Sequence, residues 1–409
     1  MRERFGVLPS SDRPLATAIV VNYDAWTETV ELASRLADSS AARAGRLGVL
    51  VVDNASPSPP PSATRDWRRL PLIGDELSNG APVSASASEP KGASAPSRVR
   101  WLPRPINDGF AAGINAGRAH SRAPWLWVFN PDVELEPATI EATLDWLERL
   151  DLESSSNARL GIVGLRLTNP DGSTQPSVGP FPSLARVFRE LWLPRRQRNY
   201  HPPERVSRGR VDWVTGACVL IRTALLDDLG GMDQDFFLYH EEVALCRSAV
   251  DRGWIVWFEP DLHATHCHPL QNRAVSTWLR VILRHSKLLY FRKHRPPWEL
   301  SVLARLIEWE ARLRPWTAPA RDRRAWRSIL RLALRMRRPQ ARFPLGVRVR
   351  HLADEATGRP LPPAERIDSR IDSAHSGSSG PILGRPGTWS RPTPLPAPTT
   401  RHPASDPRP

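Results

Sequence analysis

The 409-residue sequence has few cysteines and no long apolar run. Its three cysteines, Cys218, Cys246 and Cys267, are odd in number and far apart, which argues against a disulfide framework and favours a reducing compartment. No segment approaches the ~18 continuous apolar residues that a membrane-spanning helix needs, and the N-terminus lacks the apolar core of a signal peptide. We therefore expect a cytoplasmic protein, unless it lies on a membrane surface.

Acidic residues are in the minority: 57 Lys and Arg stand against 43 Asp and Glu, a net charge of +14. This excess predicts an anionic partner, which can be nucleic acid, phospholipid or a phosphorylated substrate. Composition alone leaves all three open. A hydrophobic fraction of 40% is enough for one large core with appendages or for two modest domains.

The chain divides into a patterned domain and segments of low complexity. Residues 1–14 are predicted to be a flexible N-terminus, residues 57–97 a surface insertion without a core pattern, and residues 351–409 a disordered tail rich in Pro, Ser and Arg. In residues 15–297, Val-rich runs such as ATAIVV and LGVLVVD alternate with segments of helical periodicity. This alternation predicts an α/β domain with a mostly parallel sheet flanked by helices.

Polar residues follow four of the predicted strands where these end, at 22–24 (NYD), 53–56 (DNAS), 107–109 (NDG) and 130–134 (NPDVE). Turn chemistry explains each cluster taken alone, because Asn, Asp, Gly and Pro are common at strand exits. Four in succession favour a bound ligand, since ligands of open α/β sheets collect beyond the carboxyl ends of the strands. We therefore predict a nucleotide or another polar ligand at this edge.

Carboxylates in these clusters suggest two functions. Asp132 and Glu134 can hold a hard divalent cation, Mg²⁺ or Mn²⁺, that would bridge the phosphates of a nucleotide. The alternative for Asp132 is to cap the helix that starts at Pro137. Asp53 can accept a hydrogen bond from a nucleobase N–H, and an Asx-turn explains this residue equally well.

The segment FFLYHEEVALCRS (236–248) places two glutamates in an apolar run. A helix is predicted from near His240 to Gly253. At ~100° per residue, its apolar face consists of Leu245, Cys246, Ala249 and Val250. Glu242 falls near the middle of this face and Glu241 on its edge. Both complement the positive end of a helix, but an inward carboxylate costs free energy unless it borders a polar cavity, so Glu242 is the predicted general base.

The segment HATHCHP contains His263, His266, Cys267 and His268. This spacing is too tight for a standard structural zinc site, and no CxxC pair exists elsewhere in the chain. Packed or surface histidines explain the segment. The alternative is a single histidine that contacts a metal.

Seven motifs occur in a fixed order: AIVVNYDAW, VLVVDNAS, NDGFAAGINAG, FNPDVEL, VDWVTGACVLIR, GGMDQDFFLYHEEVALCRSAVDRGW and RHSKLLYFRKH. Together they resemble the family 2 inverting glycosyltransferases, most closely the rhamnosyltransferase-like branch that builds bacterial cell-wall and surface polysaccharides. The resemblance covers roughly residues 15–295 apart from the insertion. It implies a GT-A fold, a single α/β domain with a nucleotide-binding half and an acceptor-binding half.

The resemblance also assigns positions of this sequence to the site. It implies that the nucleotide-sugar is bound by Asn22, Tyr23, Asp53, Asn107, Gly109, Phe110, Asn115 and Asp132. Asp132 stands at the metal-binding acidic position, and His266 matches a position that can complete the metal site. Trp213 and Gly216 would line the donor-sugar and acceptor region.

In this family the base is the Asp of an ED pair, and Glu242 stands at the matching position. Glu241, the other member of the pair, is the second catalytic candidate. The acid that usually follows two residues later is replaced by Ala244. The implied reaction is a direct displacement in which Glu242 deprotonates an acceptor hydroxyl and a nucleoside diphosphate leaves. The expected donor is dTDP-rhamnose and the expected acceptor a glycan or lipid-linked sugar. A QxxRW motif is absent, so one sugar is expected per encounter.

Residues 298–350 are rich in Arg and Trp and predict a basic, amphipathic helical extension. In residues 321–338 the apolar stripe consists of Trp326, Ile329, Leu330, Ala333 and Leu334. This pattern is typical of a helix on an anionic membrane surface, here the inner face of the plasma membrane, and a helix packed on the catalytic domain explains it equally well. A basic nucleic-acid- or membrane-binding protein on a degenerate glycosyltransferase scaffold is the alternative from another class. Because no nucleic-acid-binding motif occurs, we expect no nucleic-acid partner.

Overall fold

The computed structural model describes residues 13–71, 98–152, 159–190, 192, 198–269, 275–337 and 343–358. All of them belong to the first of two compact units of the chain, residues 1–365. Most of the predicted N-terminus, residues 72–97 of the predicted insertion and the tail beyond residue 358 lie outside the described residues. The cysteines Cys218, Cys246 and Cys267 are all free, as predicted.

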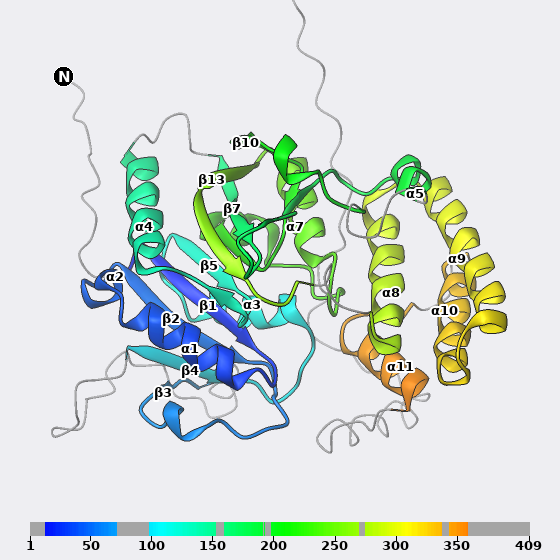
Figure 1. The fold of residues 1–409 in the computed structure, drawn as a ribbon, viewed down its shortest axis with the longest axis horizontal. Helices are drawn as coiled ribbons and strands as arrows, with labels where there is room; N and C mark the ends of the chain where they lie inside the picture. Colours follow the sequence, from blue (N-terminus) through cyan, green and yellow to red (C-terminus); the bar gives the residue numbers. More distant parts are fainter. Residues whose placement is uncertain are drawn as a thin grey trace, which may run out of the picture. The chain divides into compact units, whose positions relative to one another are not determined.

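The first half of the domain alternates strands and helices as the sequence predicts. Its elements are β1 (Ala16–Asn22), α1 (Trp26–Ala37), α2 (Ser40–Arg43), β2 (Leu47–Asp53), β4 (Val99–Pro103), α3 (Phe110–Ala119) and β5 (Trp125–Phe129). β1 pairs in parallel with β2 and β5, and β2 pairs in parallel with β4. The runs are rich in Val and Ile because both faces of these strands are covered (Figure 1).

The described part of the insertion contributes η1 (Ser62–Thr64) and the edge strand β3 (Arg68–Arg69), which pairs in parallel with β4. Thr64 is buried. The insertion is therefore not wholly without a structural pattern, contrary to the prediction.

The second half of the domain adds antiparallel strands to the sheet. Its elements are β6 (Val133–Glu134), α4 (Pro137–Leu152), β7 (Leu160–Thr168), β8 (Thr174–Gln175), β9 (Val178–Gly179), α5 (Leu184–Glu190), η3 (Pro203–Arg205), β10 (Gly209–Arg210), β11 (Trp213–Val214), β12 (Cys218–Arg222), α6 (Thr223–Leu229), α7 (Glu241–Asp251) and β13 (Ile255–His266). The strand order is β10-β13-β7-β12-β5-β1-β2-β4-β3, with β12 antiparallel between β5 and β7. The predicted fold class, a mostly parallel sheet flanked by helices, is confirmed.

The sheet separates two apolar cores. Successive residues of β1 alternate between them: Ile19 and Val21 belong to one, and Ala18 and Val20 to the other. A fully buried Val or Ile contributes about 1.5–3 kcal/mol, so this alternation fixes which side of each strand faces which helices.

The C-terminal extension is helical, as predicted. Helices α8 (Thr277–His294), α9 (Pro297–Thr317), α10 (Arg323–Met336) and α11 (Val347–Thr357), with the short η5 (Ala320–Asp322), pack against one another beside the sheet (Figure 1). α11 runs past residue 350, so the predicted boundary of the tail lies too early in the chain. Within the described part of the chain, no helix has the length and apolarity that crossing a membrane requires.

The membrane interpretation of the α10 stripe is wrong for most of its residues. Trp326, Ile329 and Ala333 are buried, and α10 contacts α8, α9 and α11. The alternative of a helix packed on its own domain is therefore correct. Periodicity identifies an apolar face, but both a bilayer and a neighbouring helix can cover such a face.

Candidate active site

The four predicted polar clusters lie at one edge of the sheet. Asn22 and Asp53 end the neighbouring parallel strands β1 and β2 and stand opposite each other in register. The Asn54 N–H donates to the Asn22 carbonyl at 2.8 Å, and the Asn130 N–H donates to the Ala217 carbonyl at 2.8 Å. The topology therefore brings together segments that lie far apart in the sequence.

Asn22 orients Asp53 from within the fold. Its amide donates to Asp53 Oδ1 at 3.0 Å, while its own oxygen accepts from the Thr29 hydroxyl at 2.9 Å. The Ser56 N–H also donates to Asp53 Oδ1 at 3.3 Å, which is the Asx-turn alternative. Within the described part of the chain these hydrogen bonds all end on Oδ1, which leaves Oδ2 for a ligand. Burial raises the pKa of Asp53, against the hydrogen bonds from Ser56 and Asn22.

Gly109 joins the nucleotide side of the domain to the segment before α7. Its φ of +113° is in the region that favours glycine, and a Cβ there would lie 2.4 Å from the Phe237 carbonyl oxygen. The Phe110 N–H donates to that same oxygen at 3.1 Å. Gly109 also fixes Asn107, whose side-chain oxygen accepts from the Gly109 N–H at 3.2 Å and from the Asn54 amide at 3.0 Å.

Asn115 belongs to the same joint, by which we mean the contacts between residues 109–115 and residues 232–237. Its amide donates to the Met232 carbonyl at 2.9 Å, and its oxygen accepts from the Met232 N–H at 2.8 Å. Both ends of the side chain are thus occupied by the protein backbone. Its predicted place near the nucleotide-sugar stays a prediction, and in the structure it holds α3 to the Met232 segment.

Asp132 and His266, 134 positions apart in the sequence, meet at the end of β13. His266 Nε2 lies 3.4 Å from Asp132 Oδ2, and the His268 N–H donates to the same oxygen at 3.1 Å. Burial opposes ionisation of Asp132, but the contacts with His266 and His268 prevail and hold its pKa below the usual value. The carboxylate is therefore charged and able to hold a cation. His263 is exposed, as the surface alternative predicts.

The neighbourhood of His266 fits a metal ligand. Gln175 Nε2 lies 3.0 Å from His266 Nδ1, and Gln175 Oε1 is buried without a partner among the described residues. A half-turn of the Gln175 amide would place its Oε1 against the Nδ1–H of His266. His266 Nε2 would then keep the lone pair that a metal requires. The described residues contain no group of three potential His, Cys, Asp or Glu metal ligands. A Mg²⁺ or Mn²⁺ ion at Asp132 would therefore need further oxygen ligands from the substrate.

α7 starts with an unusual backbone. Tyr239 and His240 have φ values of +65° and +67°, which non-glycine residues rarely adopt, and the helix begins directly after them at Glu241. The helix lies close to where the sequence predicts it. The strained turn determines the directions in which the two glutamates leave the backbone.

The predicted burial of the glutamate pair is reversed. Glu241 is buried and Glu242 is only partly buried, while Val250, placed on the apolar face, is 40% exposed. α7 contacts β11, β13, α6 and α8, so it has no single buried face of the kind that a helical wheel assumes. Glu242 is therefore the outer residue of the pair, although its Oε2 atom is buried.

Burial raises the pKa of both glutamates. For Glu242 it reaches about 7, although backbone N–H groups at the helix start favour the ionised form. The pKa of Glu241 is raised well above its ordinary value, first by burial and then by the charge of Glu242. Neither Oε2 atom has a hydrogen-bond partner in the described parts of the chain. The Glu242 carboxyl can therefore gain and lose a proton near neutral pH.

Gly216 and Phe110 lie beside Glu242. A Cβ at Gly216 would stand 3.5 Å from the Glu242 Cβ and 3.7 Å from the Phe110 ring. Trp213 is buried, its ring centroid lies 5.2 Å from that of Tyr200, and its indole N–H donates to the Pro180 carbonyl at 2.9 Å. Gly216 therefore borders Glu242, while Trp213 supports the site from inside the fold.

Sequence reasoning missed Arg350 of α11. This buried side chain donates to the Tyr23 hydroxyl at 3.3 Å and to the Asn107 carbonyl at 3.4 Å, and it lies 3.7 Å from the Asp354 carboxylate. Tyr23 itself is 43% exposed. The C-terminal extension thus places a cation at the edge where the nucleotide is predicted. No sequence signal distinguishes Arg350 from its many neighbouring arginines.

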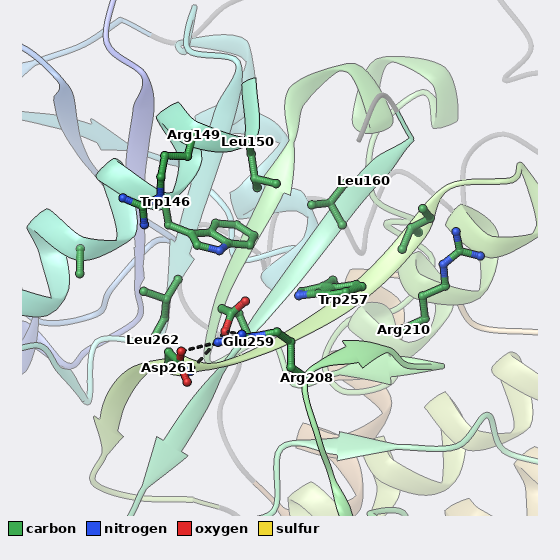
Figure 2. A pocket seen from close by; sticks show the side chains of 12 residues that line it. Trp146, Arg149, Leu150, Leu160, Arg208, Arg210, Trp257, Glu259, Asp261 and Leu262 are labelled. Carbon is green, nitrogen blue, oxygen red and sulfur yellow. Dashed lines mark hydrogen bonds and ion pairs between the residues drawn. The ribbon is translucent and has the colours of Figure 1, made fainter. Parts of the chain in front are cut away.

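A cavity of about 610 Å³ lies away from these residues, between α4 and β13. Figure 2 shows Trp146 and Trp257 on its walls and Arg208 reaching Glu259 and Asp261. None of the predicted site residues lines it. The candidate active site is therefore the sheet edge and not this cavity.

Known proteins resemble this chain over the same region. A family model described as "Glycosyltransferase like family 2" matches residues 90–280. The N-acetylglucosaminyl-diphospho-decaprenol L-rhamnosyltransferase of Mycobacterium tuberculosis is 32% identical over 221 residues, which cover 46% of this chain and 68% of that protein. The low-salt glycan biosynthesis hexosyltransferase Agl10 of Haloferax volcanii is 24% identical over 200 residues, which cover 45% of this chain and 57% of that protein.

Solved structures also align with the chain. S. aureus TarS 1–349 in complex with UDP-GlcNAc covers 88% of this chain and 92% of its own, with a TM-score of 0.44 and 11% identity. The mannosyltransferase PcManGT from Pyrobaculum calidifontis, in complex with GDP-Man and Mn²⁺, covers 91% and 84%, with a TM-score of 0.41 and 15% identity.

Proposed function

Because the chain belongs to the family 2 glycosyltransferases, we propose that it transfers one sugar from a nucleotide-sugar to a glycan or lipid-linked acceptor with inversion. The observation that carries this proposal is Glu242, a partly buried carboxylate with a pKa of about 7 beside Gly216 and Phe110. A base with a pKa near the working pH combines a useful ionised fraction with a strong drive to accept a proton.

The donor would lie across the ends of β1, β2 and β5. Asp53 Oδ2 accepts from the nucleobase, and Tyr23 and Arg350 border the nucleotide, where the cation also attracts phosphate charge. Asp132 and His266 would hold the divalent ion, Mg²⁺ or Mn²⁺, which when bound supplies positive charge to the leaving diphosphate. The remaining steps are performed by side chains of this chain.

Glu242 performs the proton transfer. Its carboxylate takes the proton of an acceptor hydroxyl, and the acceptor oxygen forms a bond to the anomeric carbon as the bond from that carbon to the nucleoside diphosphate breaks. One displacement inverts the anomeric configuration. Burial raises the pKa of Glu241 and favours its neutral form, so Glu241 competes less for that proton.

The proposed sugar is rhamnose, from dTDP-rhamnose, and the proposed acceptor is a polyprenyl-diphosphate-linked sugar. This follows from the name of the 32% identical relative, an N-acetylglucosaminyl-diphospho-decaprenol L-rhamnosyltransferase. Such an acceptor is held in a membrane, so we place the reaction at an anionic membrane surface, the inner face of the plasma membrane.

Calorimetry and a transfer assay test this proposal. The panel consists of dTDP-rhamnose, UDP-glucose, UDP-galactose and GDP-mannose, each with and without Mn²⁺ or Mg²⁺. One nucleotide-sugar should bind more tightly with metal, and Asp132→Ala should remove this gain. Glu242→Gln should lower transfer about 10²–10⁴-fold at unchanged donor affinity, while Glu241→Gln, the matched control, should remain active. Full turnover of Glu242→Gln would refute the assignment of the base.

A further inference from the structure

α9 displays a line of exposed tryptophans. Trp298, Trp309 and Trp316 are 61%, 62% and 87% exposed, and Leu313 beside them is 62% exposed. At about 100° per residue the three tryptophans fall within about 20° of one another and span about 27 Å of the helix. Exposed apolar surface of this extent on one helix indicates a binding surface.

The opposite face of α9 is already used by the fold. Leu303, Ala304, Ile307 and Ala311 are buried, and α9 contacts α8 and α10. A helix that packs on one side only should carry polar residues on the other side. The tryptophans therefore do not serve the packing of the described part of the domain.

The acidic residues of α9 are neutralised beside the bundle. Glu299 pairs with Arg295, Glu308 with Arg337 at 2.7 Å, and Glu310 with Arg284 at 2.7 Å. On the same wheel, the exposed Arg305 and Arg312 fall within about 40° of Trp298. The stripe is thus a row of indoles with positive charge along it.

The neighbouring helix α10 adds more charge of the same sign. It has no acidic residue between 323 and 336 and exposes Arg323, Arg324, Arg327, Arg331 and Arg335. Because α10 packs against α9, these arginines add exposed positive charge to the helix pair that carries the tryptophan stripe. Their complement is a surface with dense negative charge.

We propose that the α9 stripe docks the enzyme on an anionic phospholipid bilayer. Indoles settle at the level of the lipid headgroups because they have an apolar body and an N–H donor, and the arginines bind the headgroup phosphates. The proposal rests on the proposed function for its purpose, since a lipid-linked acceptor lies in that plane. It differs from the sequence prediction, because α10 supplies charge while α9 supplies the apolar contact.

Vesicle flotation tests the docking surface. The full-length protein should float with phosphatidylcholine vesicles that contain phosphatidylglycerol and stay behind with phosphatidylcholine alone. Replacing Trp298, Trp309 and Trp316 together by Ser should lower the bound fraction about tenfold or more, since about three indoles leave the interface. These side chains are exposed, so the melting temperature should not change.

A second pair of variants tests the charge. Arg305→Gln with Arg312→Gln should weaken flotation, whereas Arg65→Gln with Arg122→Gln, the same charge change at exposed residues outside the bundle, should not. Equal loss in both pairs would mean general electrostatic attraction without a docking surface, and would overturn the proposal.

Further outcomes separate docking from catalysis. The triple Trp variant should keep its nucleotide-sugar affinity and its transfer to a water-soluble acceptor, and lose transfer to an acceptor embedded in vesicles. Glu242→Gln should float normally while inactive, so a failure of the proposed function leaves the docking result readable. Docking is refuted if the wild type does not float, if the triple variant floats like the wild type, or if the stripe instead holds a dimer that the triple variant dissociates.

Discussion

The pH dependence of transfer should follow the ionisation of Glu242. Burial raises the pKa of this carboxyl to about 7, above the ordinary value of 4.5. Only the ionised form can accept the hydroxyl proton. The rate should therefore fall as the pH drops through 7, instead of staying constant down to pH 5 as it would for an exposed glutamate.

The size of the effect follows from the titration. With a pKa of about 7, roughly 90% of the carboxyl is ionised one pH unit above this value and roughly 10% one unit below it. Between pH 8 and pH 6 we therefore expect about a tenfold loss in kcat/KM. Below that, each pH unit should cost a further factor of about ten.

The assay is initial-rate release of the nucleoside diphosphate at saturating metal, with donor binding measured separately at each pH. Glu241→Gln is the control, because burial raises the pKa of Glu241 and so favours its neutral form, which Gln resembles; this replacement should leave the acid limb near pH 7. An acid limb that stays near 4.5, or one that moves strongly in Glu241→Gln, would refute the division of roles between the two glutamates.

Four further results are expected. Asp132→Asn should abolish the metal-dependent part of donor binding in calorimetry while leaving the melting temperature near that of the wild type. Gly109→Ala should lower the free energy of unfolding by about 1–3 kcal/mol or more, and therefore the melting temperature, because it adds strain at positive φ and a clash with the Phe237 carbonyl. Arg350→Ala should raise the KM for the donor several-fold with little change in kcat in steady-state kinetics. In thermal melts, Glu241→Gln should be more stable than the wild type at pH 8, and this gain should be smaller at pH 5. The reason is that a raised carboxyl pKa makes the stability of the wild type fall as the pH rises above 4.5, by at most about 1.4 kcal/mol per pH unit.

Several strands and helices of the domain could be predicted closely from the sequence. The Val-rich run at 16–21 is β1 (Ala16–Asn22), and the periodic segment from Pro137 is α4 (Pro137–Leu152). Short apolar runs and helical periodicity are local signals, and here the tertiary structure agrees with them. The shared edge of the four polar clusters followed from the alternation of strand and helix alone.

What could not be predicted depends on what each element packs against. The helical wheel placed Glu242 inward and Glu241 at the edge, and the order is reversed because α7 is covered from several sides. The α10 stripe was assigned to a membrane for the same reason: periodicity does not show which neighbour covers an apolar face. Arg350 reaches Asn107 across 243 positions of sequence, and no periodicity or motif reports a contact at that separation.

The contact between Gly109 and Phe237 also determines how this enzyme can be recombined with its relatives. The Gly109 backbone has no room for another side chain against Phe237, and Asn115 holds the Met232 backbone at both ends of its amide. A chimera that takes its nucleotide half from one enzyme and its acceptor half from another must import both sides of this joint together. A crossover placed between Asn115 and Met232 would separate residues selected to fit each other, so donor preference should be exchanged with the whole joint or by point changes around Asp53.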